Sequence, residues 1–174
     1  MSDTNIPRPI PSRSGAAAIA SGAFIVPLAL SASSSPSPNH PDTLAWYKTL
    51  RVPSFKPPDW TVPVAWVAIE SALAAAVYRL LRAPSSAARS RALALLGWNV
   101  TMIGAWSRLF FGRRDLGAST AAAVTMVATG VAYVNEAKRV DKPAARAGVP
   151  FVAWVAFATV LTASIWRLNA RRHR

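Results

Sequence analysis

Aromatic side chains are the residues of this sequence whose spacing suggests a binding site. Between residues 46 and 66 there are three Trp, one Tyr, one Phe and four Pro. Later aromatic residues recur at intervals of three or four, so each group shares one face of a helix. Large rings on shared faces would suit a large, flat, apolar ligand, and the alternative for each Trp is packing or a place in a membrane-interface belt. The residues on these faces are Trp66, Asn99, Trp106, Phe110, Trp154, Phe157 and Ala158, and the segment adds Trp46, Phe55 and Trp60.

Conventional catalytic chemistry finds little support in the sequence. His40 and His173 are the only histidines, and neither stands at metal-ligand spacing from carboxylates. The chain has no Cys, which excludes disulfides, thiol nucleophiles and Cys-ligated metals. No nucleophile stands near a base in an apolar segment, and no glycine-rich phosphate loop is present. We therefore expect no catalytic or metal-binding residues.

The aromatic segment itself, residues 46–66, is rigid because of its prolines. Pro53, Pro57, Pro58 and Pro63 remove backbone donors and fix φ, which excludes regular helix from most of the segment. We predict an extended loop that becomes helical near Trp60. A loop this apolar fits poorly on a surface in water, but it would suit a lid over the mouth of a helical bundle.

The helices on either side of this loop are predicted from stretches that contain no charged residue or only one. Residues 14–41, 92–107, 116–135 and 147–166 contain no Asp, Glu, Lys or Arg, and residues 60–78 contain only Glu70. A helix needs roughly 20 residues to cross the hydrocarbon core. The sequence therefore predicts an all-α integral, multi-pass membrane protein, with five transmembrane helices and a Trp/Pro-rich loop between the first and the second.

The predicted domain organisation follows from these spans. We expect a disordered polar tail over residues 1–14, the transmembrane domain over 15–170 and a basic tail over 171–174. The expected helices cover residues 15–32, 60–81, 89–111, 116–138 and 147–170. An alternative for the first one is a signal peptide, because Arg8 and Arg13 precede it and small residues follow it.

The excess of positive charge has to be explained by the membrane or by nucleic acid. The net charge is +13, with 20 Lys and Arg against 7 Asp and Glu. The basic residues lie at span ends and between spans, as expected for contact with lipid headgroups. This distribution argues against nucleic-acid binding. It does not give an orientation, because Lys and Arg are equally numerous on the two predicted faces.

Three motifs in order resemble one known family. They are W-Y-x-x-L-x-x-P-S-F-x-P-P-x-W with P-x-x-W after it, W-S-x-L-F-F at residues 106–111, and W-V-x-F-A-x-x-L-x-x-x-I-W-x-L-N at 154–169. Together they resemble the tryptophan-rich sensory protein / translocator protein family, over roughly residues 15–170. The resemblance implies five membrane helices, frequent dimers, and a cavity for porphyrins, sterols or benzodiazepine-type ligands. By motif match it implies ligand contacts at Pro53, Phe55, Trp66, Trp106, Trp154, Phe157 and Ala158, and structural roles for Trp166 and Asn169.

Three departures from the family pattern affect which ligands the chain is expected to bind. Ile103 stands where members usually have Asn, and Asn99 where they often have Gln, so the third helix offers fewer polar contacts. Glu70 replaces a usual Tyr, and a carboxylate in mid-membrane has to be paired, protonated or ligand-facing. A sterol motif that pairs Tyr with Arg is incomplete, because no Tyr follows Tyr133.

The resemblance therefore implies a tetrapyrrole-binding sensor or transport protein in a lipid bilayer, as a homodimer. A porphyrin or haem-type molecule would be its ligand, with no permanently bound cofactor. One alternative is a membrane enzyme that degrades porphyrin, in which Trp66 and Trp154 would act. Another is a transporter for small solutes, which would show flux without tight porphyrin binding.

Overall fold

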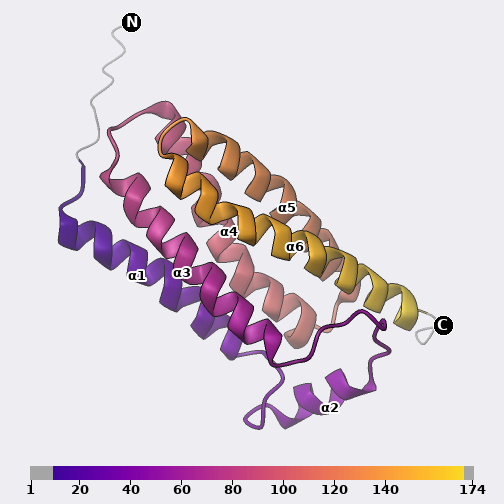
Figure 1. Cartoon of the computed structure of the whole chain (residues 1–174). Helices are drawn as coiled ribbons and strands as arrows, with labels where there is room; N and C mark the ends of the chain where they lie inside the picture. The colour runs from indigo at the N-terminus through magenta and orange to yellow at the C-terminus, as the bar shows by residue number, and fades with distance from the viewer. Residues whose placement is uncertain (1–9, 171–174) are drawn as a thin grey trace, which may run out of the picture.

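The structure, a computed structural model, describes residues 10–170, and they form helices joined by turns (Figure 1). Five helices are long, one is short, and no strand occurs among the described residues. The elements are α1 (Arg13–Ala32), α2 (Pro41–Thr49), α3 (Thr61–Arg82), α4 (Ala87–Ser107), the π-helical turn η1 (Arg108–Gly112), α5 (Leu116–Lys138) and α6 (Lys142–Asn169).

The five long helices form a closed ring. Their main contacts run from α1 to α3, α6, α5, α4 and back to α1. Leu73, Leu80, Leu96, Tyr133 and Phe151 fill the interior and are fully buried. The α3–α4 and α5–α6 turns lie at one end, which we call the turn end. At the other, the lid end, α2 and the chain up to Trp60 form the lid, defined as residues 41–60 (Figure 1).

Side-chain caps fix where four of the five long helices begin. Ser12, Ser86, Asp115 and Asp141 each accept a hydrogen bond from the backbone N–H three residues on. Asp141 also receives the guanidinium of Arg79, with N–O distances of 2.8 and 2.9 Å. These hydrogen bonds lower the pKa of the Asp141 carboxyl, so it stays ionised as a cap at neutral pH.

A buried arginine joins α3 to α4. The Arg89 guanidinium donates to the carbonyl oxygens of Leu80 and Leu81 at 2.8 and 2.9 Å, and to the Ser85 hydroxyl at 3.0 Å. These carbonyls belong to the last turn of α3, where a cation is favoured by the helix dipole. Arg89 thus belongs to α4, but its side chain stabilises the C-terminal end of α3.

Small residues allow two close helix approaches. A Cβ on Gly104 would lie 2.7 Å from the Cβ of Leu30, so α1 and α4 touch there through a glycine. Nearby, Ser107 donates to the Ser31 hydroxyl at 3.2 Å. Between α5 and α6, the Tyr133 ring fills the space over Gly148, and its hydroxyl donates to the Ala144 carbonyl at 2.7 Å. Residues 13–32 thus pack closely against the other helices of the bundle.

The number of apolar helices differs in one respect from the prediction. Four of the described helices, α1, α3, α5 and α6, are long and apolar enough to cross a bilayer. The helix α4 is long but less apolar, since it contains Arg89, Arg91 and Asn99. An all-helical architecture with apolar spans is confirmed, and the sixth helix, α2, was not predicted.

Several predicted boundaries were wrong. The first helix begins at Arg13, so the predicted tail over residues 1–14 is too long; its first nine residues and the basic tail at 171–174 lie outside the described residues. The α-helix expected to reach residue 111 ends at Ser107 and continues as a π turn. The last helix starts at Lys142, five residues early, because a proline in the first turn needs no N–H partner.

Candidate ligand-binding site

A first aromatic cluster joins the lid to the end of α4. The rings of Trp46 and Phe110 meet edge to face at 5.9 Å between centroids, and Trp106 stacks on Phe110 at 5.0 Å. Tyr47 meets Phe111 edge to face at 5.9 Å. Trp46 and Tyr47 lie in α2, which corrects the prediction of an extended loop at these two residues. The contacts with Phe110 and Phe111 account for the short helix, which has no buried residue of its own.

The π turn η1 places both Phe rings of this cluster. Its defining bond runs from the Arg113 N–H to the Arg108 carbonyl at 2.8 Å. The wider turn lets consecutive residues, Phe110 and Phe111, both contact aromatic rings, and Phe110 is only 3% exposed. Trp106 is fixed as well, because its indole N–H donates to the Ser119 carbonyl at 2.9 Å. This cluster is therefore a rigid part of the lid end.

A second aromatic cluster joins the lid to α6. Phe55 meets Phe157 edge to face at 6.3 Å, and Phe157 lies 5.7 Å from Trp154. Phe55 is 48% exposed, whereas Trp154, Phe157 and Ala158 are half-buried. Ala158 adds almost no bulk beside the two rings of α6. This cluster is more open than the first and offers aromatic faces to an incoming molecule.

The lid is attached to the last turn of α6 by a side-chain amide. The Arg51 N–H donates to Asn169 Oδ1 at 3.1 Å, and Asn169 Nδ2 donates to the Arg51 carbonyl at 2.9 Å. Both polar groups of one lid residue are thus satisfied by one buried Asn, as a strand partner would do. We call this pair of hydrogen bonds the Asn169 bracket. The structural role predicted for Asn169 agrees with it.

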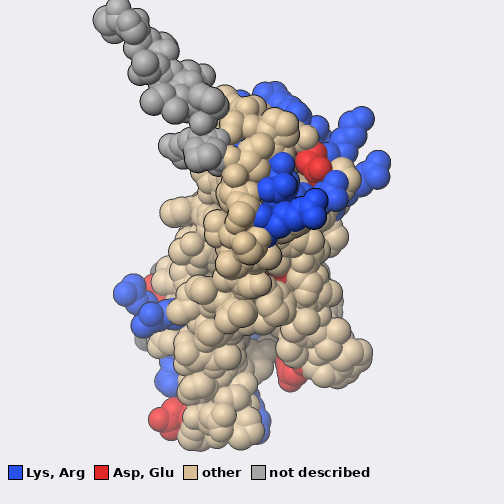
Figure 2. Space-filling model, turned by 90° about the vertical axis from the view of Figure 1, so that its left-hand side faces the viewer, with Lys and Arg blue, Asp and Glu red and all other residues tan. Residues whose placement is uncertain are grey.

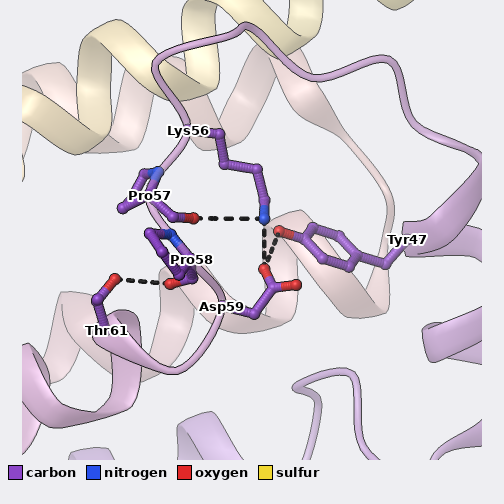
Figure 3. Close-up of polar contacts among 6 residues, drawn as sticks. All are labelled: Tyr47, Lys56, Pro57, Pro58, Asp59 and Thr61. Atoms are coloured by element: carbon purple, nitrogen blue, oxygen red, sulfur yellow. Dashed lines mark hydrogen bonds and ion pairs between the residues drawn. The ribbon is translucent and has the colours of Figure 1, made fainter.

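Polar contacts connect α2 to the far part of the lid. Figure 3 shows the Lys56 ammonium on the Asp59 carboxylate, with the Tyr47 hydroxyl donating to the same carboxylate at 3.4 Å. Burial raises the pKa of the Tyr47 phenol. Burial alone would lower the pKa of Lys56, but the hydrogen bonds and electrostatic attraction of Asp59 and Tyr47 together outweigh it, and the pKa is raised. Lys56 therefore stays charged at neutral pH and holds the lid in one shape.

The remaining predicted site residues lie in three different environments. Trp66 is half-buried against the core, and Pro53 is half-buried in the lid. Asn99 is 1% exposed, donates to the Leu95 carbonyl at 2.8 Å and accepts from the Thr129 hydroxyl at 3.0 Å. The amide of Asn99 is thus engaged within α4 and with α5. Glu70 is also 1% exposed, and its Oε2 has no hydrogen-bond partner among the described residues.

The structure therefore divides the predicted site instead of gathering it around one point. Trp46, Trp106 and Phe110 form one cluster, and Phe55, Trp154 and Phe157 form another. Sequence reasoning missed four contributors to the lid end: Tyr47, Lys56, Asp59 and Phe111. The i,i+3 spacing of Lys56 and Asp59 was a usable signal for an ion pair. The contact of Tyr47 with Phe111 depends on tertiary packing, and no local pattern in the sequence indicated it.

Comparisons with known proteins agree on one family. Residues 23–167 match the model of the TspO/MBR family. The translocator protein of Sus scrofa is 34% identical over 134 residues, which cover 74% of this chain and 78% of that protein. Protein CrtK of Rhodobacter capsulatus is 33% identical over 130 residues, covering 72% and 79%. The tryptophan-rich sensory protein of Cereibacter sphaeroides is 28% identical over 127 residues, covering 73% and 78%.

Proposed function

Because the chain belongs to the TspO/MBR family and is an integral, multi-pass membrane protein, we propose that it binds tetrapyrroles of the porphyrin type and acts in sensing or transport. Two of the relatives carry names that point to these roles, translocator protein and tryptophan-rich sensory protein. The porphyrin in this proposal is a ligand that exchanges, and no cofactor is held permanently.

The observation that supports this proposal best is the open aromatic cluster at the lid end. Phe55 from the lid and Trp154 and Phe157 from α6 present ring faces beside the small side chain of Ala158. A porphyrin is flat and aromatic, so it gains both area burial and stacking against such rings. Phe55 is itself a lid residue, so a movement of the lid relative to α6 would change the space beside these rings. We propose Trp46, Pro53, Trp66, Trp106 and Phe110 as the surrounding wall.

The same proposal includes five membrane crossings and self-association. Between Ala92 and Ser107, α4 has no charged residue, and Arg89 and Arg91 lie at its turn end. The helix α4 lies between α1 and α5 in the closed ring, and its 21 residues are comparable to the 20 and 23 of these two apolar helices. We propose that it crosses the membrane with them, and that two copies form a homodimer.

The test is a titration of the purified full chain, in detergent micelles, with protoporphyrin. We expect saturable quenching of Trp fluorescence together with a shift in porphyrin absorbance. Phe55→Ala should weaken binding at least about threefold, because it removes one ring from the cluster. The matched control is Phe24→Ala in α1, whose ring belongs to neither aromatic cluster. Quenching that does not saturate, or equal losses in both variants, would contradict the proposal.

The fate of the porphyrin separates binding from catalysis. For a sensor or transport protein, porphyrin extracted after incubation in light and air should have its original mass and spectrum. Covalent change that depends on Trp66 or Trp154 would instead establish the enzymatic alternative.

A further inference from the structure

A hollow at the turn end lies far from the aromatic clusters. Its volume is about 280 Å³, and it is formed where α5 ends and α6 begins. Ala145 and Val149 form an apolar floor, and the side chains of Lys138, Lys142 and Arg146 surround it. We call these three basic residues the rim cations. Figure 2 shows Lys and Arg side chains gathered at this upper end of the molecule.

The rim cations have no acidic partner within residues 10–170. The two acids of the turn end are engaged elsewhere: Asp141 pairs with Arg79, and Glu136 pairs with Arg91 and Arg139. All three rim cations are exposed. Three positive charges around one hollow repel each other, and an anion placed between them would relieve that repulsion.

The depth of the hollow along α6 matches the headgroup region of a bilayer. Immediately after Arg146 comes the charge-free stretch 147–166, which is long enough to cross the hydrocarbon core. Val149, on the floor, is therefore at the start of the apolar layer. The rim cations stand just outside it, where phosphate groups of lipids lie.

Below the hollow, two stripes of exposed valines continue along the helices. Val149 and Val160 of α6 are 51% and 58% exposed, and their spacing of 11 residues keeps them on one face. On α5, Val131 and Val124 stand 7 and 14 residues before Lys138 and are 44% and 54% exposed. Each stripe thus leads from a rim cation into the apolar layer.

We propose that this hollow is a binding site for an anionic phospholipid. Its phosphate would lie among the rim cations, and its acyl chains would follow the valine stripes of α5 and α6. The site needs both parts, because phosphate alone makes no use of the stripes and a zwitterionic lipid brings its own positive charge to the rim. A leaflet rich in anionic lipid would then hold the turn end on its side of the membrane.

The experiment is native mass spectrometry of the full chain, released from detergent after incubation with equal amounts of phosphatidylglycerol and phosphatidylcholine that carry the same acyl chains. We expect the unmodified chain to retain phosphatidylglycerol at least tenfold over phosphatidylcholine. The triple variant Lys138→Gln, Lys142→Gln, Arg146→Gln should lose this preference, with roughly a tenfold fall in bound phosphatidylglycerol.

A matched control removes the same charge from the lid end. Lys48, Arg113 and Arg167 are exposed there, and their triple change to Gln should leave the lipid preference intact. Equal losses in both triple variants would mean general attraction to a basic protein, which overturns the site. Unbiased retention of both lipids would overturn it too.

Further measurements test whether a soluble anion or a second copy of the chain, and not a lipid, occupies this face. Millimolar inorganic phosphate should not displace the lipid, and displacement would assign the hollow to a soluble anion instead. Val149→Trp should fill the hollow without changing charge and lower phosphatidylglycerol binding, because the position is exposed and tolerates bulk. If the rim-cation triple variant instead dissociates a dimer, a second copy of the chain covers this face and the proposal fails.

Discussion

Ala158 is the residue whose size decides how much room the open cluster leaves. It lies one helical turn after Trp154 and next to Phe157, and all three are half-buried. Ala158→Phe would place a third ring where a ligand is proposed to lie. We expect porphyrin affinity to fall at least about tenfold, or about 1.4 kcal/mol, with the helical circular dichroism unchanged. The measurement is the Trp-quenching titration.

Ala128 on α5 supplies the matched control. It is exposed, and its helix contributes no ring to either aromatic cluster. Ala128→Phe should therefore bind porphyrin like the unmodified chain. Equal effects from the two substitutions, or no effect from Ala158→Phe, would place Ala158 at a helix or lipid contact.

Glu70 is the other residue for which the structure changes the argument. The buried amide of Asn99 is already engaged with Leu95 and Thr129. An ionised carboxylate in mid-membrane costs on the order of 2.5–3.5 kcal/mol, so at 1% exposure we expect a neutral Glu70. Glu70→Gln keeps that neutrality and should leave porphyrin affinity within about twofold at neutral pH. A tenfold rise in affinity would show an ionised carboxylate that repels the ligand.

At the scale of elements, the Asn169 bracket is a polar contact that couples the lid to the bundle, beside the two aromatic clusters. Asn169→Leu removes both hydrogen bonds to Arg51 and leaves an N–H and a carbonyl without those partners, at a cost of about 1–3 kcal/mol. We expect amide hydrogen exchange in residues 48–56 to accelerate at least about fivefold, as measured by mass spectrometry of the protein in micelles.

Asn135→Leu is the control for this change, since Asn135 is an exposed residue of α5. It should leave lid exchange unaffected. Accelerated exchange throughout the chain in Asn169→Leu would indicate loss of the fold, and unchanged exchange in the lid would show that the aromatic contacts alone hold it.

The long helices were predictable from the sequence because a charged side chain is costly to place inside a membrane. Stretches without Asp, Glu, Lys or Arg marked the spans, and the predicted range 116–138 agrees with α5 as observed. The short helix α2 and the π turn depend on rings from distant segments, which local propensity does not reveal. The last helix was predicted to start five residues too late, at 147, because a proline such as Pro143 breaks a helix from inside but is favourable in its first turn.

The candidate site was predictable as separate faces but not as one assembly. Helical spacing placed Asn99 and Phe110 on one shared face, and both are buried, Asn99 in α4 and Phe110 in η1. Which faces meet depends on the order of helices around the ring, and spacing within one helix carries no information about that order. The division into two clusters therefore became visible only in three dimensions.

At the scale of the whole molecule, the five crossings proposed above would place the two ends of the ring on opposite sides of the membrane. The chain has no Cys, so single cysteines can report accessibility. In sealed vesicles, Ser14→Cys and Ala87→Cys at the turn end should react alike with an impermeant maleimide. Ser54→Cys and Ala170→Cys at the lid end should show the opposite accessibility. Reaction of Ser14→Cys and Ala170→Cys from the same side would contradict five crossings.

The Asn169 bracket also has a consequence for biosynthesis. It joins residues 118 positions apart, and Asn169 leaves the ribosome after every other helical residue described here. Arg51 emerges early, yet its backbone N–H and carbonyl gain their hydrogen bonds to Asn169 only after the final helix has been inserted. In a chain stalled before Asn169, the lid would lack these two hydrogen bonds. A membrane protease that recognises such a loosely held segment would then distinguish unfinished copies from finished ones.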